Sequence, residues 1–150
     1  MIVGVTKRAL ISHRDERGSL TEVLRSDWPD FVAFGQAIVT INLPGVVRAW
    51  HWHRQQTDVI VAISGTVLLP LYDGRPASSS FKQLEEHVSN EGDRFALFVP
   101  PGVYHGYKTL GPTSAVILNF PSHTYDPLLP DEERVPHDDA EIAYDWSSRG

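Results

Sequence analysis

Two segments of the chain concentrate side chains that can move protons or bind metal ions. Residues 45–58 carry His51 and His53, and residues 100–107 carry His105. Residues two positions apart on a β-strand project from the same face, so His51 and His53 are expected to point the same way. An imidazole near its ordinary pKa serves either as a general base or as a metal ligand. These segments therefore predict a site for proton transfer or metal binding.

The elements that position these histidines are predicted to be short strands. Apolar and β-branched residues gather in four runs, separated by Gly and Pro: residues 36–42, 59–71, 95–99 and 114–120. Ser64-Gly65 interrupts the second run and predicts a hairpin turn. Many short strands of this kind indicate a β-sandwich or β-barrel. A short helix is expected only near residues 130–134, inside a tail that starts at Ser122 and wraps over the barrel.

The spacing of the two histidine segments resembles the two-part signature of the cupins. Gly45 is followed by five residues, His-x-His, four residues, the acid Asp58, six residues and Gly65, and Pro-x-Gly-x-x-His comes later. The resemblance implies an all-β, double-stranded β-helix (jelly-roll) barrel. We expect one cupin domain over residues 1–150, with a barrel core at about 32–121, an N-terminal strand segment and a helical or irregular C-terminal tail.

The same side chains form a possible metal-ligand set of three imidazoles and one carboxylate. It consists of His51, His53, Asp58 and His105. Such ligands suit a divalent transition metal such as Fe, Mn, Ni, Zn or Co. One interpretation is therefore a metal-dependent cupin enzyme, either a dioxygenase or an isomerase, acting on a small molecule.

Five short motifs between residues 15 and 146 resemble the dTDP-4-dehydrorhamnose 3,5-epimerase family of cupins. The motifs are Asp15-x-Arg17-Gly18-x-Leu20-x-Glu22, Gly45-Val-x-Arg48-x-x-His51, Pro101-Gly102-x-x-His105-Gly106-Tyr107, Tyr125-x-Pro127, and Asp138-Asp139 followed by Asp145-Trp146. Their order and spacing carry the resemblance. It implies an isomerase that epimerises or isomerises a nucleotide-linked 4-keto-6-deoxy sugar by removing a proton alpha to the ketone, without a cofactor.

The resemblance also implies catalytic roles. His51 would be the base, Asp139 would pair with it, and Tyr125 would return a proton on the opposite face of the sugar. Asp58 stands where the family has a lysine that stabilises the enolate oxygen. The missing lysine leaves a third interpretation, a non-catalytic sugar-binding cupin.

Substrate contacts follow from the same resemblance. Arg48 would hold the diphosphate, His105 would line the sugar pocket, and Arg17 and Glu22 would reach the nucleotide across a homodimer interface. Strand parity places Arg48 on the face opposite His51, so a bulge or strand end is needed to turn it inward. The acidic run at residues 131–133 is expected to face solvent.

Bulk composition narrows the function classes. A chain of 150 residues with 41% hydrophobic residues suits one domain with a real core. The absence of cysteine excludes disulfides and thiolate chemistry and fits a reducing cytoplasm. No signal peptide or membrane-spanning run is expected. A net charge of −6 argues against general nucleic-acid binding, so the expected partner is a small molecule.

Overall fold

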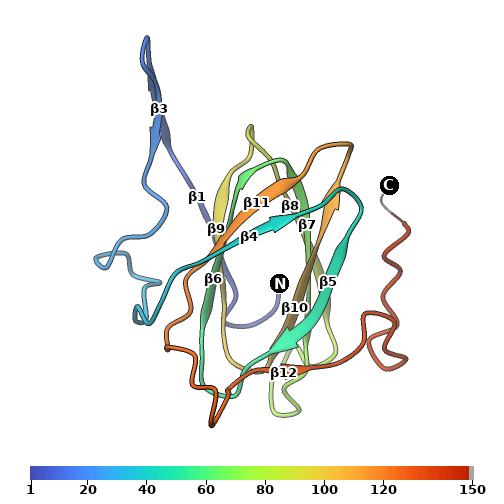
Figure 1. Ribbon diagram of the computed structural model, residues 1–150. Coiled ribbons are helices and arrows are strands. Elements are labelled where there is room, and N and C mark those ends of the chain that lie inside the picture. Colours follow the sequence, from blue (N-terminus) through green and yellow to red (C-terminus); the bar gives the residue numbers. More distant parts are fainter. Residues whose placement is uncertain (149–150) are drawn as a thin grey trace.

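The computed structural model describes residues 1–148, so the expected domain of residues 1–150 extends two residues beyond it. Two five-stranded antiparallel sheets face each other (Figure 1). The first has the order β1 (Thr6–Ala9), β9 (Phe95–Val99), β6 (Asp58–Ser64), β11 (Ala115–Asn119) and β4 (Ile38–Asn42). The second has the order β12 (Glu133–Arg134), β5 (Val47–Trp52), β10 (Val103–Leu110), β7 (Thr66–Asp73) and β8 (Leu84–Ser89). The predicted all-β jelly-roll is confirmed.

A separate hairpin, β2 (Ser12–Asp15) and β3 (Gly18–Thr21), projects from the barrel (Figure 1). Its two strands pair only with each other among the strands of residues 1–148. Leu20 on this hairpin is exposed.

The core lies between the two sheets because successive side chains of a strand alternate between its faces. On β6, Ile60 and Ala62 join the central cluster, whereas Val59 and Val61 pack on the outside under the N-terminal segment that includes Trp28. The outer face of the second sheet is covered by the C-terminal tail, in a cluster formed by Trp50, Tyr72, Ile142 and Trp146. The N-terminal segment therefore covers the outer face of the first sheet, and the C-terminal tail covers the outer face of the second. This is why β6 and β7 are buried along most of their length.

Two local predictions were wrong. Ser64-Gly65 is not a hairpin turn, because β6 and β7 belong to different sheets. Gly65 lies at the corner where the chain passes from the first sheet to the second. Its φ is +78°, and a Cβ there would lie 2.9 Å from the Cα of Ala115. The short helix expected at residues 130–134 is absent from the described chain. Its last part is β12, which pairs with β5 and so satisfies its backbone groups between strands.

No helix within residues 1–148 has the length and apolar character needed to cross a membrane.

Candidate active site

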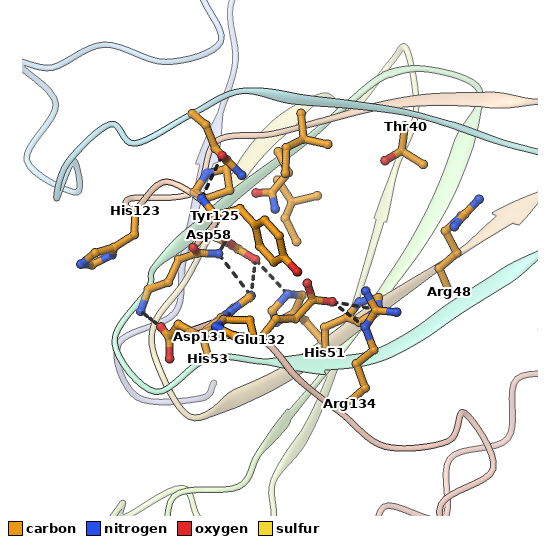
Figure 2. A pocket seen from close by; sticks show the side chains of 18 of the residues that line it. Thr40, Arg48, His51, His53, Asp58, His123, Tyr125, Asp131, Glu132 and Arg134 are labelled. Atoms are coloured by element: carbon orange, nitrogen blue, oxygen red, sulfur yellow. Dashed lines mark hydrogen bonds and ion pairs between the residues drawn. The ribbon is translucent and has the colours of Figure 1, made fainter. Parts of the chain in front are cut away.

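A cavity of about 1180 Å³ opens between the sheets. Strands β4, β5, β6, β10 and β11 line it, together with residues 121–136 of the tail. The lining includes His51, His53, Asp58, His105, Tyr125 and Glu132. Figure 2 shows that the labelled side chains come from both the barrel strands and the tail. The histidines from the two sequence motifs are thus brought together, with His105 opposite His51 in the pairing of β10 with β5.

A bulge in β5 lets Arg48 and His51 face the same cavity. His105 pairs with His51 and Tyr107 pairs with Arg48, so three steps along β5 oppose two along β10. The additional residue reverses the alternation of faces, and both side chains line the cavity. The bulge that strand parity required is therefore present.

Gly106 permits this bulge, because a Cβ at that position would lie 2.4 Å from the Cβ of Ala49 and 2.9 Å from the carbonyl oxygen of Arg48. Replacing Gly106 by alanine is expected to lower the free energy of unfolding by about 2 kcal/mol, since the bulge must shift to make room. Urea denaturation measures the effect, with Gly92→Ala as the control. Gly92 lies in a turn where the nearest atom to an added Cβ is 3.3 Å away. Equal losses in the two variants would contradict this account of the bulge.

Asp58, the residue at the family's lysine position, is the centre of a buried cluster. Its Oδ2 lies 3.1 Å from Nε2 of His53 and 3.0 Å from Nε2 of His105, and its Oδ1 accepts a hydrogen bond from Gln56 at 2.8 Å. Burial alone would raise the pKa of Asp58, but the hydrogen bonds from His105 and His53 outweigh it and hold that pKa well below its ordinary value. Burial also lowers the pKa of His53, but its hydrogen bond to Asp58 prevails and the net direction is upward.

The Nδ1 atoms of these two histidines are fixed by backbone carbonyls. His53 Nδ1 donates to the Asp131 carbonyl at 2.6 Å, and His105 Nδ1 donates to the Val103 carbonyl at 3.1 Å. A carbonyl and an ionised carboxylate only accept, so each ring donates from Nδ1 to its carbonyl and from Nε2 to Asp58. A metal ion would bind at Nε2 only after that proton is lost, with Nδ1 still held by its carbonyl, which is how metal-ligating histidines are commonly oriented.

His53, Asp58 and His105 are accordingly the residues that could hold a metal ion. One ligand atom from each lies within 4.8 Å of the other two. His51, the expected fourth ligand, is not in this group, and its Nε2 instead faces Glu132 at 3.9 Å. The four-residue set expected from the sequence is therefore reduced to three.

His51 has the electrostatic setting of a neutral base. Burial lowers its pKa to about 4, with a further contribution from nearby His105, while Glu132 acts in the opposite direction. At neutral pH the ring therefore carries no charge and can accept a proton.

If His51 is the base, the pH dependence of kcat/KM should reflect the lowered pKa of His51. Only the unprotonated ring can act, so kcat/KM is expected to hold as the pH falls through the ordinary histidine value of 6.5 and to drop only near pH 4. A pH profile of kcat/KM measures this, with circular dichroism at each pH to verify folding. An acid limb centred at 6.5 would contradict the assignment.

The acidic run at residues 131–133 does not simply face solvent, as the sequence suggested. Asp131 accepts hydrogen bonds from the backbone N–H groups of Arg54, Gln55 and Gln56 at 2.8–3.0 Å. Glu132 lines the cavity, where Arg134 Nε donates to its Oε1 at 2.7 Å. No local pattern marks these roles, because they depend on the pairing of β12 with β5.

Tyr125 lies at the cavity wall with 57% of its surface exposed, and its backbone N–H donates to Gln36. Its ring is directed toward Glu132 and His51 (Figure 2). Arg48 lies apart from this group and donates from Nε to Asn42 at 3.0 Å. The base and the proton donor expected from the resemblance thus share one cavity.

Three expected site residues are not brought to this cavity in the described chain. Asp139 accepts hydrogen bonds from the backbone of Glu141 and Ile142 and lines a second cavity of about 200 Å³. The expected pairing of Asp139 with His51 is therefore not found. Arg17 lies at the end of the projecting hairpin and binds Asp15, and Glu22 binds Arg25 beyond β3. Their expected reach across a dimer interface stays a prediction.

Comparisons with known proteins agree with the fold and the motifs. The model of the dTDP-4-dehydrorhamnose 3,5-epimerase family matches residues 1–149. The spore coat polysaccharide biosynthesis protein SpsL of Bacillus subtilis is 36% identical over 99% of this chain and 98% of its own length. A probable low-salt glycan biosynthesis epimerase of Haloferax volcanii, Agl13, is 37% identical over 96% of this chain and 94% of its own. A dTDP sugar isomerase structure from Desulfovibrio desulfuricans G20 superposes with a TM-score of 0.93 at 27% identity, covering 99% of this chain and 94% of that one.

Proposed function

Because this chain belongs to the dTDP-4-dehydrorhamnose 3,5-epimerase family, we propose that it is an isomerase that epimerises a dTDP-linked 4-keto-6-deoxy sugar. The observation that carries the proposal is His51, a partly buried imidazole with a lowered pKa that faces a large cavity shared with Tyr125. Epimerisation next to a ketone needs a neutral base and a proton donor, and His51 and the Tyr125 phenol line one cavity.

The proposed reaction starts with proton transfer from the carbon alpha to the ketone to His51. The products of this step are an enolate and an imidazolium. Tyr125 then donates its hydroxyl proton to the opposite face of the same carbon, which inverts it, and solvent restores both residues. The enolate oxygen needs hydrogen-bond donors or positive charge. In this chain the Nε2 atoms of His53 and His105 donate to Asp58, so an enolate oxygen that receives either of them must displace the Asp58 carboxylate from that donor.

The substrate diphosphate has three arginine candidates, because Arg48, Arg54 and Arg134 all line the cavity. Guanidinium groups bind phosphate oxygens in a bidentate manner. Arg48 and Arg134 belong to the paired strands β5 and β12, so the spacing of these two is set by the sheet.

A homodimer is part of the proposal. β4 is the edge strand of its sheet and exposes Val39 and Ile41, and the adjoining Leu43 is also exposed. An apolar sheet edge of this kind is suited to covering by a second copy of the chain. In such a dimer Arg17 and Glu22 would complete the partner's nucleotide site. Sedimentation analysis tests the dimer, and a monomer with full activity would contradict it.

A cytoplasmic location is also proposed. The support is a chain without cysteine and a substrate of the nucleotide-sugar class. Fractionation of the native cells tests it.

We propose that the reaction proceeds without a cofactor. The second candidate function, a metal-dependent cupin enzyme, is favoured by the convergence of His53, Asp58 and His105 on one point. A metal held there would act as a Lewis acid toward a bound oxygen. Metal analysis of protein purified without chelators separates the two. Stoichiometric metal that is lost in His53→Ala would favour the second candidate.

The deciding experiment for the epimerase is solvent-deuterium incorporation into a dTDP-linked 4-keto-6-deoxyhexose, followed by NMR. Exchange at a carbon next to the ketone is expected. Absence of exchange with several nucleotide sugars, combined with measurable binding of one of them, would instead support a non-catalytic sugar-binding cupin.

A further inference from the structure

His51 faces a carboxylate other than the one expected from the family resemblance. Its Nε2 lies 3.9 Å from Oε1 of Glu132, and both side chains line the main cavity. Asp139 lines a different cavity, and its Oδ1 accepts two backbone hydrogen bonds there. Asp58 is engaged with His53 and His105. Glu132 is therefore the carboxylate that the fold presents to His51.

Sheet pairing fixes Glu132 relative to His51. Strand β12 is paired with β5, with Arg134 in register with His51. Beyond it, the backbones of Trp50 and Val135 exchange two hydrogen bonds of 3.0 and 3.2 Å. The backbone on the C-terminal side of Glu132 is thus hydrogen-bonded to β5, the strand that carries His51.

The other side of Glu132 is anchored by Asp131. The Asp131 carboxylate accepts three backbone N–H groups from residues 54–56, and its carbonyl accepts from His53. Hydrogen bonds to the barrel therefore hold the tail both at the residue before Glu132 and in the strand β12 that follows it. Such an arrangement holds a side chain in place without requiring the substrate to order it.

Arg134 keeps the Glu132 carboxylate charged. Burial would raise the pKa of Glu132, but the hydrogen bond from Arg134 Nε, 2.7 Å from Oε1, outweighs it and lowers that pKa. The side chain of Arg134 is 71% exposed, so solvent screens the repulsion between its guanidinium group and a protonated His51. A negative charge consequently stands 3.9 Å from Nε2 of His51.

We propose that Glu132 is the positioning carboxylate of His51, which holds the ring in place and stabilises the imidazolium that forms when His51 takes the substrate proton. This inference rests on the proposed epimerase function. The proton that leaves carbon resides on His51, while Glu132 stays ionised throughout and exchanges no proton. The ion pair is complete only after proton transfer, so it favours the reacting state over the bound substrate.

The test is Glu132→Gln, which removes the charge but leaves an amide oxygen able to accept from Arg134. We expect kcat for epimerisation to fall about 10²-fold with KM unchanged, because a charge that acts only after proton transfer does not affect binding. Glu132→Asp should recover part of the loss. The matched control is Glu133→Gln, which removes the neighbouring carboxylate. Glu133 binds Arg54 and lies outside the cavity lining.

The outcomes separate this inference from the proposed function. If the wild-type protein shows no deuterium exchange, the proposed function fails and the inference falls with it. If the wild type exchanges deuterium but Glu132→Gln keeps its kcat, or loses no more than Glu133→Gln, only the inference is overturned. A selective loss of kcat in Asp139→Asn, with Glu132→Gln unaffected, would return the role to Asp139. Thermal unfolding of each variant shows that kcat is compared between folded proteins.

Discussion

Replacing His51 by asparagine is expected to lower the rate of solvent-deuterium incorporation into a dTDP-linked 4-keto-6-deoxyhexose by about 10³-fold. His51 is partly buried, faces the cavity, and has a pKa lowered to about 4, so the wild-type ring is ready to accept a proton at neutral pH. Asparagine keeps a polar side chain of similar reach but has no basic nitrogen. NMR of the sugar ring protons in D₂O measures the exchange.

His123→Asn is the matched control for this prediction. His123 also lines the cavity, but it is exposed and its Nδ1 lies 3.0 Å from the Ser122 hydroxyl. Exchange should persist in this variant. Exchange that survived in His51→Asn would show that another group removes the proton, and the metal-dependent candidate would then gain support if the protein carried stoichiometric metal.

The second large effect is expected at Asp58. Replacing Asp58 by asparagine should lower the free energy of unfolding by about 3 kcal/mol, because one buried carboxylate that accepts from His53, His105 and Gln56 is lost. For a domain of this size the melting temperature should fall by roughly 10 °C. Thermal unfolding followed by circular dichroism measures the change.

Activity distinguishes a purely structural role of Asp58 from a role in the site. Asp73→Asn is the matched control, since Asp73 is equally buried, binds Arg75 and Ser80, and lies on β7 outside the cavity lining. Both variants should lose stability, but only Asp58→Asn should also lose deuterium exchange, because it releases the His53 and His105 rings. Wild-type stability in Asp58→Asn would contradict the cluster described here.

The jelly-roll and the meeting of His51 with His105 could be predicted from the sequence. Two histidine motifs at cupin spacing and four runs of β-forming residues indicated a β-barrel with His51 and His105 inside it. Tyr125 and Arg48 were expected in the cavity from the family resemblance, and both line it. The strands and the spacing of the two histidine motifs are encoded locally, because they follow from periodicity and residue type along the chain.

Carboxylate partners could not be predicted in the same way. Asp139 matches the family motif, yet the structure places it where it binds the backbone of the tail, whereas Glu132 lies beside His51. The amino-acid pattern of an acidic run is the same whether its side chains face solvent or a histidine in a cavity. Which side chain turns inward depends on where the tail adds a strand to the sheet, and that is a pairing between residues about 80 positions apart.

The sequence by itself thus determined the fold class and the position of His51 on a strand beside His105, because these follow from short-range patterns of residue type. The tertiary structure alone decided three things: the bulge that brings Arg48 to the face of His51, the separation of His51 from the His53–Asp58–His105 cluster, and the carboxylate that faces His51. Each of these depends on register and burial. A change of one residue in register reverses the face of a strand, and burial together with neighbouring charged groups sets the charge that a histidine carries.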